Sequence, residues 1–196
     1  MIMARRMKLS NAFLTGCDEK TEWMLPWFFE NYKKHNDTPV VVANFGMSSE
    51  MLDYAESESQ LVLDLSKEKE KGWFKKPKAM MMCPSNKTVW IDTDCEVKDN
   101  IEKIFNLLEV EKLAMVKDHP WTERRGELWH NSGIVGFVGQ PRILSQWMKQ
   151  VAENPVVGDQ EVLHSMLNPI TKITYIKDLP HKYNVLRIDL IDGRQP

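Results

Sequence analysis

Short apolar runs alternate along the chain with stretches of helical periodicity, the pattern typical of βα units that feed a mostly parallel sheet. The first half predicts strands at residues 12–15, 40–45, 61–65 and 89–91, with helices at 21–34, 48–55 and 72–82 between them. This alternation predicts an α/β fold: a Rossmann-like, mixed but mostly parallel sheet flanked by helices.

The second half continues the pattern. A helix is expected from residue 98, because Asp99 can cap it, Glu102 follows three residues later, and apolar residues recur at helical spacing. Further strands are expected at 113–116, 134–138 and 173–176, with helices opened by Pro141 and spanning 159–167. The polar segment 117–130 has no period and predicts a long loop, which we expect to order as a lid over a bound ligand.

Composition narrows the class of protein. The 196 residues, 42% of them hydrophobic, are enough for one domain spanning the whole chain, and a net charge of -2 with interspersed signs argues against nucleic acid as a partner. Three cysteines without a CxxC spacing argue against a disulfide framework or a zinc knuckle. No apolar stretch after residues 1–7 suits a signal peptide and no window suits a membrane span, so a cytoplasmic location is expected.

The strongest local signal is an apolar strand that ends in two carboxylates, Asp92 and Asp94. Ligands gather at the carboxyl ends of central strands in open α/β sheets. If the backbone stays extended, both carboxylates project with similar orientation and offer hard oxygen ligands to Mg²⁺ or Mn²⁺. A simple polar turn between two elements explains the same residues equally well, so their context has to decide.

That context is an ordered set of segments: Lys-Pro at 76–77, His-Asn-Ser-Gly at 130–133, Gly-Asp-Gln at 158–160, and 179–184. The succession, over roughly residues 10–190, resembles the GT-A nucleotide-sugar glycosyltransferases, especially the retaining group that includes glycogenin and the lipopolysaccharide galactosyltransferases. The resemblance implies a nucleoside diphosphate sugar donor, with UDP as the expected nucleotide, and a Mn²⁺ or Mg²⁺ ion.

The resemblance also implies roles for individual residues. Asp92 and Asp94 would hold the metal that bridges the diphosphate, with Asp92 also near the ribose, and Asp159 and Gln160 would act on the donor sugar. The remaining substrate-binding residues would be Thr15, Gly16 and Cys17 at the base and ribose, Lys76 at the phosphates, and Asn131, Ser132 and Gly133 at the sugar.

Simpler interpretations stand beside several of these roles. Lysines flanking a proline are usually solvated surface, which would also explain Lys76 and Lys78. Asp159 is a natural helix cap, and Gly16 is explained by a strand exit. The tryptophans and phenylalanines of the first helix, Trp23, Trp27, Phe28 and Phe29, are expected in the core, as is the Met80 to Met82 run.

The sequence departs from the resembled family in one respect. Members commonly add a metal ligand from a histidine beyond the last strand, in a segment rich in Gly, Lys and Trp, which does not occur before Pro196. Water and diphosphate oxygens would then complete the metal, or His181 would substitute, or the donor would bind poorly.

The sequence therefore predicts a metal-dependent glycosyltransferase that retains anomeric configuration, with an unknown glycan, lipid or protein acceptor. Two alternatives remain open. One is a non-catalytic module that binds sugar nucleotides or glycans. The other is a metal-dependent nucleotidyl or phosphoryl transferase, although neither GxxxxGK nor GxGxxG occurs.

Overall fold

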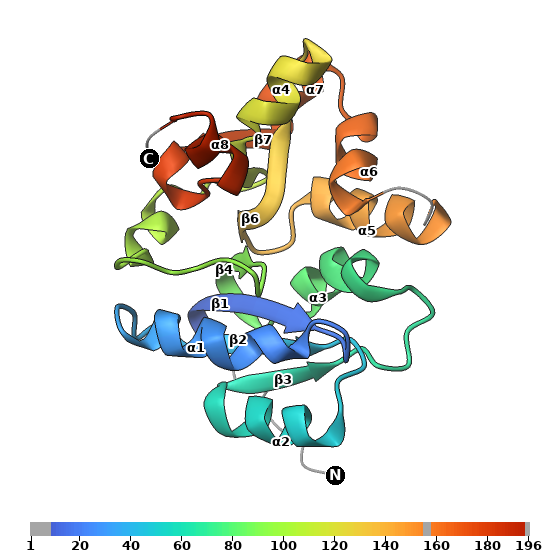
Figure 1. Cartoon of the computed structure of the whole chain (residues 1–196). Coiled ribbons are helices and arrows are strands. Elements are labelled where there is room, and N and C mark those ends of the chain that lie inside the picture. The colour runs from blue at the N-terminus through green and yellow to red at the C-terminus, as the bar shows by residue number, and fades with distance from the viewer. Residues whose placement is uncertain (1–8, 155–157, 195–196) are drawn as a thin grey trace.

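A computed structural model of the chain describes residues 9–154 and 158–194 (Figure 1). The expectation about a signal peptide in residues 1–7 therefore lies outside the described residues. The strands are β1 (Leu9–Cys17), β2 (Val40–Asn44), β3 (Leu61–Asp64), β4 (Ser85–Ile91), β5 (Leu113–Lys117), β6 (His130–Val138) and β7 (Ile176–Leu179). The α-helices are α1 (Leu25–Lys33), α2 (Ser49–Glu58), α3 (Lys76–Met82), α4 (His119–Arg125), α5 (Arg142–Glu153), α6 (Asp159–Met166), α7 (Pro169–Tyr175) and α8 (Arg187–Ile191). Short 3-10 helices are η1 (Glu22–Met24), η2 (Gly72–Lys75), η3 (Glu102–Asn106) and η4 (His181–Tyr183).

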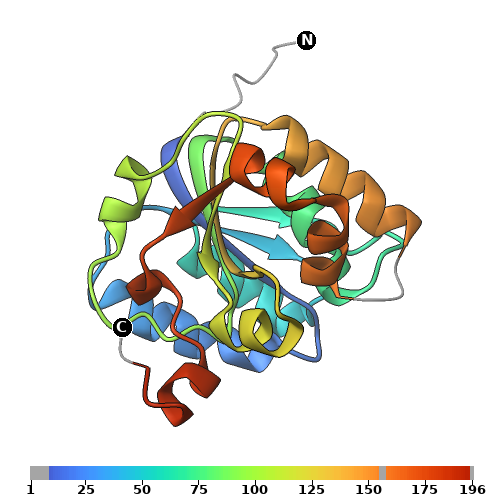
Figure 2. The same ribbon diagram turned by 90° about the horizontal axis from the view of Figure 1, so that it is seen from above.

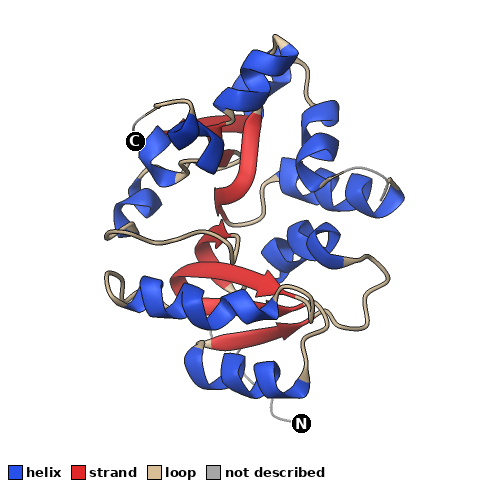
Figure 3. Cartoon of the chain, viewed as in Figure 1, coloured by secondary structure: helices blue, strands red, loops and turns tan. Residues whose placement is uncertain are grey.

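The described strands form one seven-stranded sheet in the order β3-β2-β1-β4-β6-β5-β7. Every pairing is parallel except those of β6, which runs antiparallel to both β4 and β5. The predicted fold class, a mixed and mostly parallel sheet flanked by helices, is confirmed, and Figure 3 shows the helices around the strands.

The two faces of the sheet carry separate apolar cores, because successive strand residues point to opposite faces. On β1, Ala12 and Leu14 pack in one core with residues of α3, α5 and α6, whereas Phe13 packs in the other with residues of α1, α2 and η3. Helices accordingly lie on both sides of the sheet when the molecule is viewed from above (Figure 2). Burial on both faces explains the continuous apolar runs of the strands.

Strand polarity brings the predicted site residues to one edge. Since only β6 is reversed, its amino end lies beside the carboxyl end of β4, where Ile91 pairs with Ile134 and the Asp92 N–H donates to the Gly133 carbonyl at 2.9 Å. The register of β6 against β5 jumps here: Met115 pairs with Val135 and Val116 pairs with Asn131. Ser132, Gly133 and Ile134 are therefore a bulge, a distortion often found beside functional sites.

The segment 117–130, predicted to be a loop, contains α4. The side chain of Asp118 caps this helix by accepting the Trp121 N–H at 3.0 Å, and Gly126 ends it in the left-handed conformation at φ 68. The prediction of an unstructured loop is wrong, because a short helix with a cap at each end needs no apolar period of its own. Ordering of the segment on ligand binding stays a prediction.

Two other element predictions are corrected. The helix expected from residue 98 is only the 3-10 helix η3, and Asp99 does not cap it. The Glu102 side chain instead accepts hydrogen bonds from the backbone N–H and the hydroxyl of Thr38. The strand expected at 173–176 is mostly α7, which Asn168 caps, and β7 starts only at Ile176. In both places a polar contact outweighs the local apolar pattern.

Burial in the first helix also differs from the expectation. Phe28 and Phe29 are in the core, but Trp23 is 71% exposed and Trp27 is 40% exposed. Of the methionine run, Met80 is buried and Met82 is exposed. The three cysteines are free, and no described helix is long and apolar enough to cross a membrane.

Gly126→Ala tests the end of α4. An added Cβ would meet no atom within 4 Å, so the cost is backbone strain at positive φ, and we expect the free energy of unfolding to fall by about 1 kcal/mol. Gly126→Asn should cost less, because Asn tolerates this conformation. Urea denaturation measures both, with the exposed Arg125→Ala as control. Equal stability of the wild type and Gly126→Ala would show that α4 does not end this way.

Candidate functional site

A buried lysine joins three elements at the carboxyl edge of the sheet. Lys76 begins α3, with Pro77 after it, and is only 2% exposed. Its Nζ lies 3.1 Å from Asp92 Oδ1, after β4, and 3.1 Å from Asp159 Oδ2, at the start of α6. It also donates to the Ser132 carbonyl at 3.1 Å and lies 3.2 Å from the Ser132 hydroxyl, in the β6 bulge. Lys76 therefore holds together segments that are far apart in the sequence.

The electrostatics keep Lys76 charged. Burial alone would lower its pKa, but the carboxylates of Asp159 and Asp92 outweigh that effect and hold the pKa of Lys76 above its usual range. Asp92 also accepts a hydrogen bond from the indole N–H of Trp90 at 2.6 Å.

The thiol of Cys17, in the lining of the cleft, is protonated at neutral pH. Burial raises its pKa to about 12, and the nearby carboxylates of Glu22 and Asp18 add to this effect.

A second polar network centres on Asp118, 1% exposed. Its Oδ2 accepts from the side-chain amides of Gln160 at 3.0 Å and Asn131 at 3.2 Å. Gln160 Oε1 accepts the Ser132 N–H at 3.0 Å, which connects this network to the bulge. Asn131 Oδ1 accepts from the Gly133 N–H and from the Asn184 side chain, both at 2.8 Å. The two networks together make one polar cluster at the edge of the sheet.

An open cleft lies beside this cluster, with roughly 680 Å³ of space when the open solvent at its mouth is included. β4 ends at Ile91, and the chain then turns, with the Cys95 N–H donating to the Asp92 carbonyl at 3.1 Å. The backbone after Ile91 is therefore not extended, so Asp92 is partly buried and Asp94 is exposed. The cleft is lined by Gly16, Cys17, Asp18, Lys20, Thr21, Met24, Phe45, Gly72, Trp73, Lys76, Trp90, Asp92, Thr93 and Asp94.

The predicted site residues divide into three groups. Gly16, Cys17, Lys76, Asp92 and Asp94 line the cleft. The second group belongs to the polar cluster beside it: Asn131, Ser132, Gly133, Asp159 and Gln160. Thr15 forms the third group, because it is fully buried and does not line the cleft. At Gly16 an added Cβ would lie 2.8 Å from Ala43 Cβ, so close strand packing, besides the strand exit, requires glycine there.

The structure decides between some of the competing interpretations. Gly158 occupies the N-cap position of α6, so Asp159 is not a helix cap and directs its carboxylate to Lys76 instead. Lys76 is not solvated surface. Lys78, in contrast, forms a half-exposed ion pair with Glu68 and does not line the cleft.

Asp92 and Asp94 could hold a metal ion that a bound ligand also coordinates more readily than an ion coordinated by protein side chains alone. Asp92 and Asp94 offer hard oxygen atoms at the cleft, the donor type that Mg²⁺ prefers, but Lys76 already contacts Asp92. Among residues 9–154 and 158–194, no three or more His, Cys, Asp or Glu side chains form a group that could hold a metal ion. His181 contacts Asp189 at 3.2 Å and does not line the cleft with the two aspartates, so the structure does not support it as the substitute ligand.

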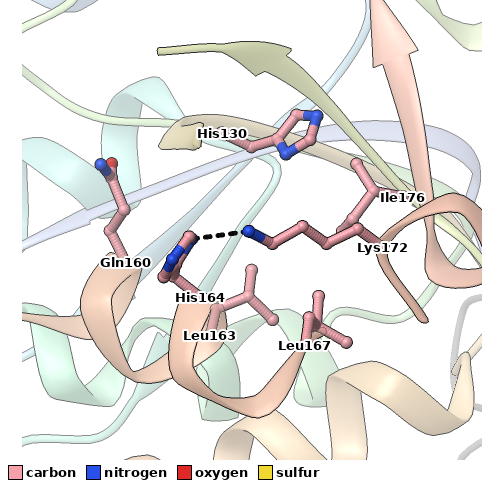
Figure 4. Close-up of a pocket in the computed structure, with 7 residues that line it drawn as sticks. All are labelled: His130, Gln160, Leu163, His164, Leu167, Lys172 and Ile176. Atoms are coloured by element: carbon pink, nitrogen blue, oxygen red, sulfur yellow. Dashed lines mark hydrogen bonds between the residues drawn. The ribbon is translucent and has the colours of Figure 1, made fainter. Parts of the chain in front are cut away.

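A smaller, mostly apolar pocket has Gln160 in its lining (Figure 4). Lys172 Nζ lies 3.0 Å from His164 Nδ1 and donates to the Leu128 carbonyl at 2.6 Å. His130 Nε2 lies 2.8 Å from Asp178 Oδ1, so this buried imidazole has a polar partner. The pocket is lined by His130, Gln160, Leu163, His164, Leu167, Lys172 and Ile176.

Two residues of the cluster, Asp118 and Asn184, were not predicted from the sequence. The Asp-His-Pro run at 118–120 carries the signal of a capped helix, which would have pointed to Asp118. Asn184 lies in the 179–184 segment that carried part of the resemblance, but nothing local marks its amide as a partner of Asn131.

Several solved structures that resemble this chain are glycosyltransferases. GlyE from Streptococcus pneumoniae matches with a TM-score of 0.68 at 16% identity, over 96% of this chain and 50% of GlyE. The galactosyltransferase LgtC, in complex with donor and acceptor sugar analogs, matches with a TM-score of 0.63 at 11% identity, over 94% of this chain and 78% of LgtC. The bifunctional glycosyltransferase WbbM matches with a TM-score of 0.60 at 12% identity, over 90% of this chain and 40% of WbbM.

The chain thus has the GT-A fold of these glycosyltransferases, as the sequence resemblance predicted. It spans about half the length of GlyE and less than half that of WbbM. No family model and no curated protein sequence matches the chain significantly.

Lys76→Met tests the buried ion cluster. Removing the ammonium leaves Asp159, itself 6% exposed, without its neutralising partner, so we expect a loss of about 3 kcal/mol or more in the free energy of unfolding. Lys78→Met should cost no more than about 1 kcal/mol, since its pair with Glu68 is half-exposed. Adding Asp159→Asn to Lys76→Met should recover part of the loss. Equal effects of the two lysine variants in denaturant titrations would contradict this description of Lys76.

Proposed function

We propose that the chain is a metal-dependent glycosyltransferase that moves a sugar from a nucleoside diphosphate donor, a UDP-sugar, to a glycan, lipid or protein acceptor. One observation carries the proposal: Asp92 and Asp94 line an open cleft whose wall continues through Lys76 into the polar cluster of Asp159 and Ser132. The fold, shared with sugar-transferring proteins, supports the same reaction class.

The donor would lie across this cleft with its diphosphate beside Asp92 and Asp94. Two carboxylates next to a diphosphate repel it unless a cation intervenes. A bound Mn²⁺ or Mg²⁺ would supply that charge and stabilise the leaving diphosphate as a Lewis acid. Asp94 is the more open carboxylate, because it is exposed whereas Asp92 already contacts Lys76 and Trp90. Of the two, Asp94 would therefore contribute most directly to metal binding.

The donor sugar would then face the polar cluster. The Ser132 N–H and the carboxylate of Asp118 hold Gln160 in place, and its carbonyl oxygen keeps a second lone pair. That lone pair can stabilise positive charge that develops at the anomeric carbon. Asp159 would orient the sugar side of the cleft while it balances the charge of Lys76. The transfer would retain the anomeric configuration through assistance by the leaving group, as in the retaining group that the sequence resembles.

A non-catalytic module that binds sugar nucleotides is the second candidate. It is favoured by the contact between Lys76 and Asp92, which reduces the free carboxylate oxygens for a metal. UDP release from a panel of UDP-sugars separates the two candidates. Turnover with any donor supports the transferase, whereas metal-dependent UDP binding without release of UDP from any donor supports the binding module.

Asp94→Ala tests the metal. We expect UDP to bind more tightly in Mn²⁺ than in chelator, because a bound cation would offset the repulsion between the diphosphate and the two carboxylates. Asp94→Ala should remove that difference, since it removes the exposed carboxylate that would hold the cation. Glu96→Ala, an exposed carboxylate in an ion pair with Lys98 and outside the cleft, is the matched control. Calorimetric titration measures the affinities. Equal UDP binding by the wild type in Mn²⁺ and in chelator would refute metal dependence.

Gln160→Ala tests the polar cluster. We expect UDP release to slow by about tenfold or more while metal-dependent UDP binding is kept, since the amide would act on the sugar and not on the nucleotide. Gln150→Ala, on the exposed side of α5, controls for general effects of amide removal. A turnover rate equal to that of the wild type would return Gln160 to a purely structural role in the cluster.

A further inference from the structure

One large aromatic side chain stands exposed in the cleft. Trp73 lines the cleft and is 59% exposed, whereas Trp90, the other tryptophan of the lining, is 2% exposed and stacks on Phe45 at 6.1 Å between ring centroids. An exposed indole at the wall of a cleft leaves a large apolar surface in contact with water. A flat ligand stacked on the ring would bury that surface.

The backbone around Trp73 fixes where the ring stands. Trp73 belongs to η2, whose first residue, Gly72, has φ 49 and therefore favours glycine. A Cβ at Gly72 would lie 3.5 Å from Asp18 Oδ2, so η2 comes close to the turn that follows β1. The Trp73 carbonyl accepts the Lys76 N–H, one helical turn away. The backbone that carries the indole thus lies between Lys76 and the turn after β1.

We propose that Trp73 is the stacking platform for the base of the nucleotide, which makes it an affinity-determining residue of the donor site. This inference rests on the proposed function. With the diphosphate beside Asp92 and Asp94, the nucleoside extends away from Ser132 and Asp159, toward the wall formed by Gly16, Asp18 and Trp73. A base presents a π-face of the kind that stacks on an indole.

The acceptor is the other ligand that could use an exposed indole. Its reacting group has to approach the anomeric carbon, which lies on the side of Asp159 and Gln160. Neither Asp159 nor Gln160 lines the cleft that holds Trp73, since both belong to the polar cluster beside it. The position of Trp73 on the side of Gly16 and Asp18 therefore favours the base over an acceptor sugar.

The test compares a ligand with a base and a ligand without one, both in Mn²⁺. UDP and inorganic pyrophosphate are titrated calorimetrically into the wild type, Trp73→Ala, Trp73→Leu and Trp73→Phe. We expect Trp73→Ala and Trp73→Leu to weaken UDP binding about tenfold, Trp73→Phe to lose much less, and pyrophosphate affinity to stay within twofold in all variants. Trp27→Ala, a partly exposed tryptophan outside the cleft, is the matched control and should change neither ligand.

The outcomes separate this inference from the proposed function. If the wild type binds UDP in Mn²⁺ but Trp73→Ala binds it equally well, Trp73 is not the platform and the proposed function stands. Equal weakening of UDP and pyrophosphate also overturns the stacking role, because the loss would then come from the diphosphate side. If the wild type binds neither ligand, the proposed function fails and this inference fails with it.

Discussion

The buried ammonium group of Lys76 is the interaction on which the rest of the site depends. A charge taken out of water is costly unless it is paired and hydrogen-bonded, and here it meets Asp92, Asp159 and the backbone and hydroxyl of Ser132. These partners come from the turn after β4, from α6 and from the bulge in β6. Burial of the Lys76 ammonium group is favourable only when all of these partners are in place. The lysine therefore connects α3, which forms a wall of the cleft, to the side of the cleft that would face the sugar.

The sequence was sufficient for the parts of this structure that local patterns specify. The apolar runs of β1 to β5 predicted strands close to their observed positions, and the abrupt change from Ile91 to Asp92 marked the end of β4. The order of polar segments then indicated the GT-A fold, which the solved structures confirm. Asp92, Lys76 and Asp159 were each identified through the ordered set of segments that carries the resemblance, not through one local motif.

What failed depends on contacts that local patterns do not carry. Lys76 looks like a surface lysine, as Lys78 is, and only the fold brings Asp159 to it. The bulge in β6 cannot be read from the sequence, since it depends on how β6 leaves its pairing with β5. Trp23 was expected in the core because it lies with Phe28 on the predicted first helix and such aromatic residues are usually buried, yet it is exposed. The capped helix α4 was missed for lack of an apolar period.

In the proposed site, Asp92 and Asp94 would hold a divalent metal against a diphosphate while Lys76 keeps the cleft wall and the polar cluster together. A crystal structure with UDP and Mn²⁺, with data collected at a wavelength that gives an anomalous Mn²⁺ signal, tests it most directly. The account predicts one peak about 2 Å from a carboxylate oxygen of Asp94 and from diphosphate oxygens, with Lys76 still in contact with Asp159. UDP bound elsewhere on the chain, or a diphosphate in the cleft with no metal between it and the two aspartates, would contradict the account.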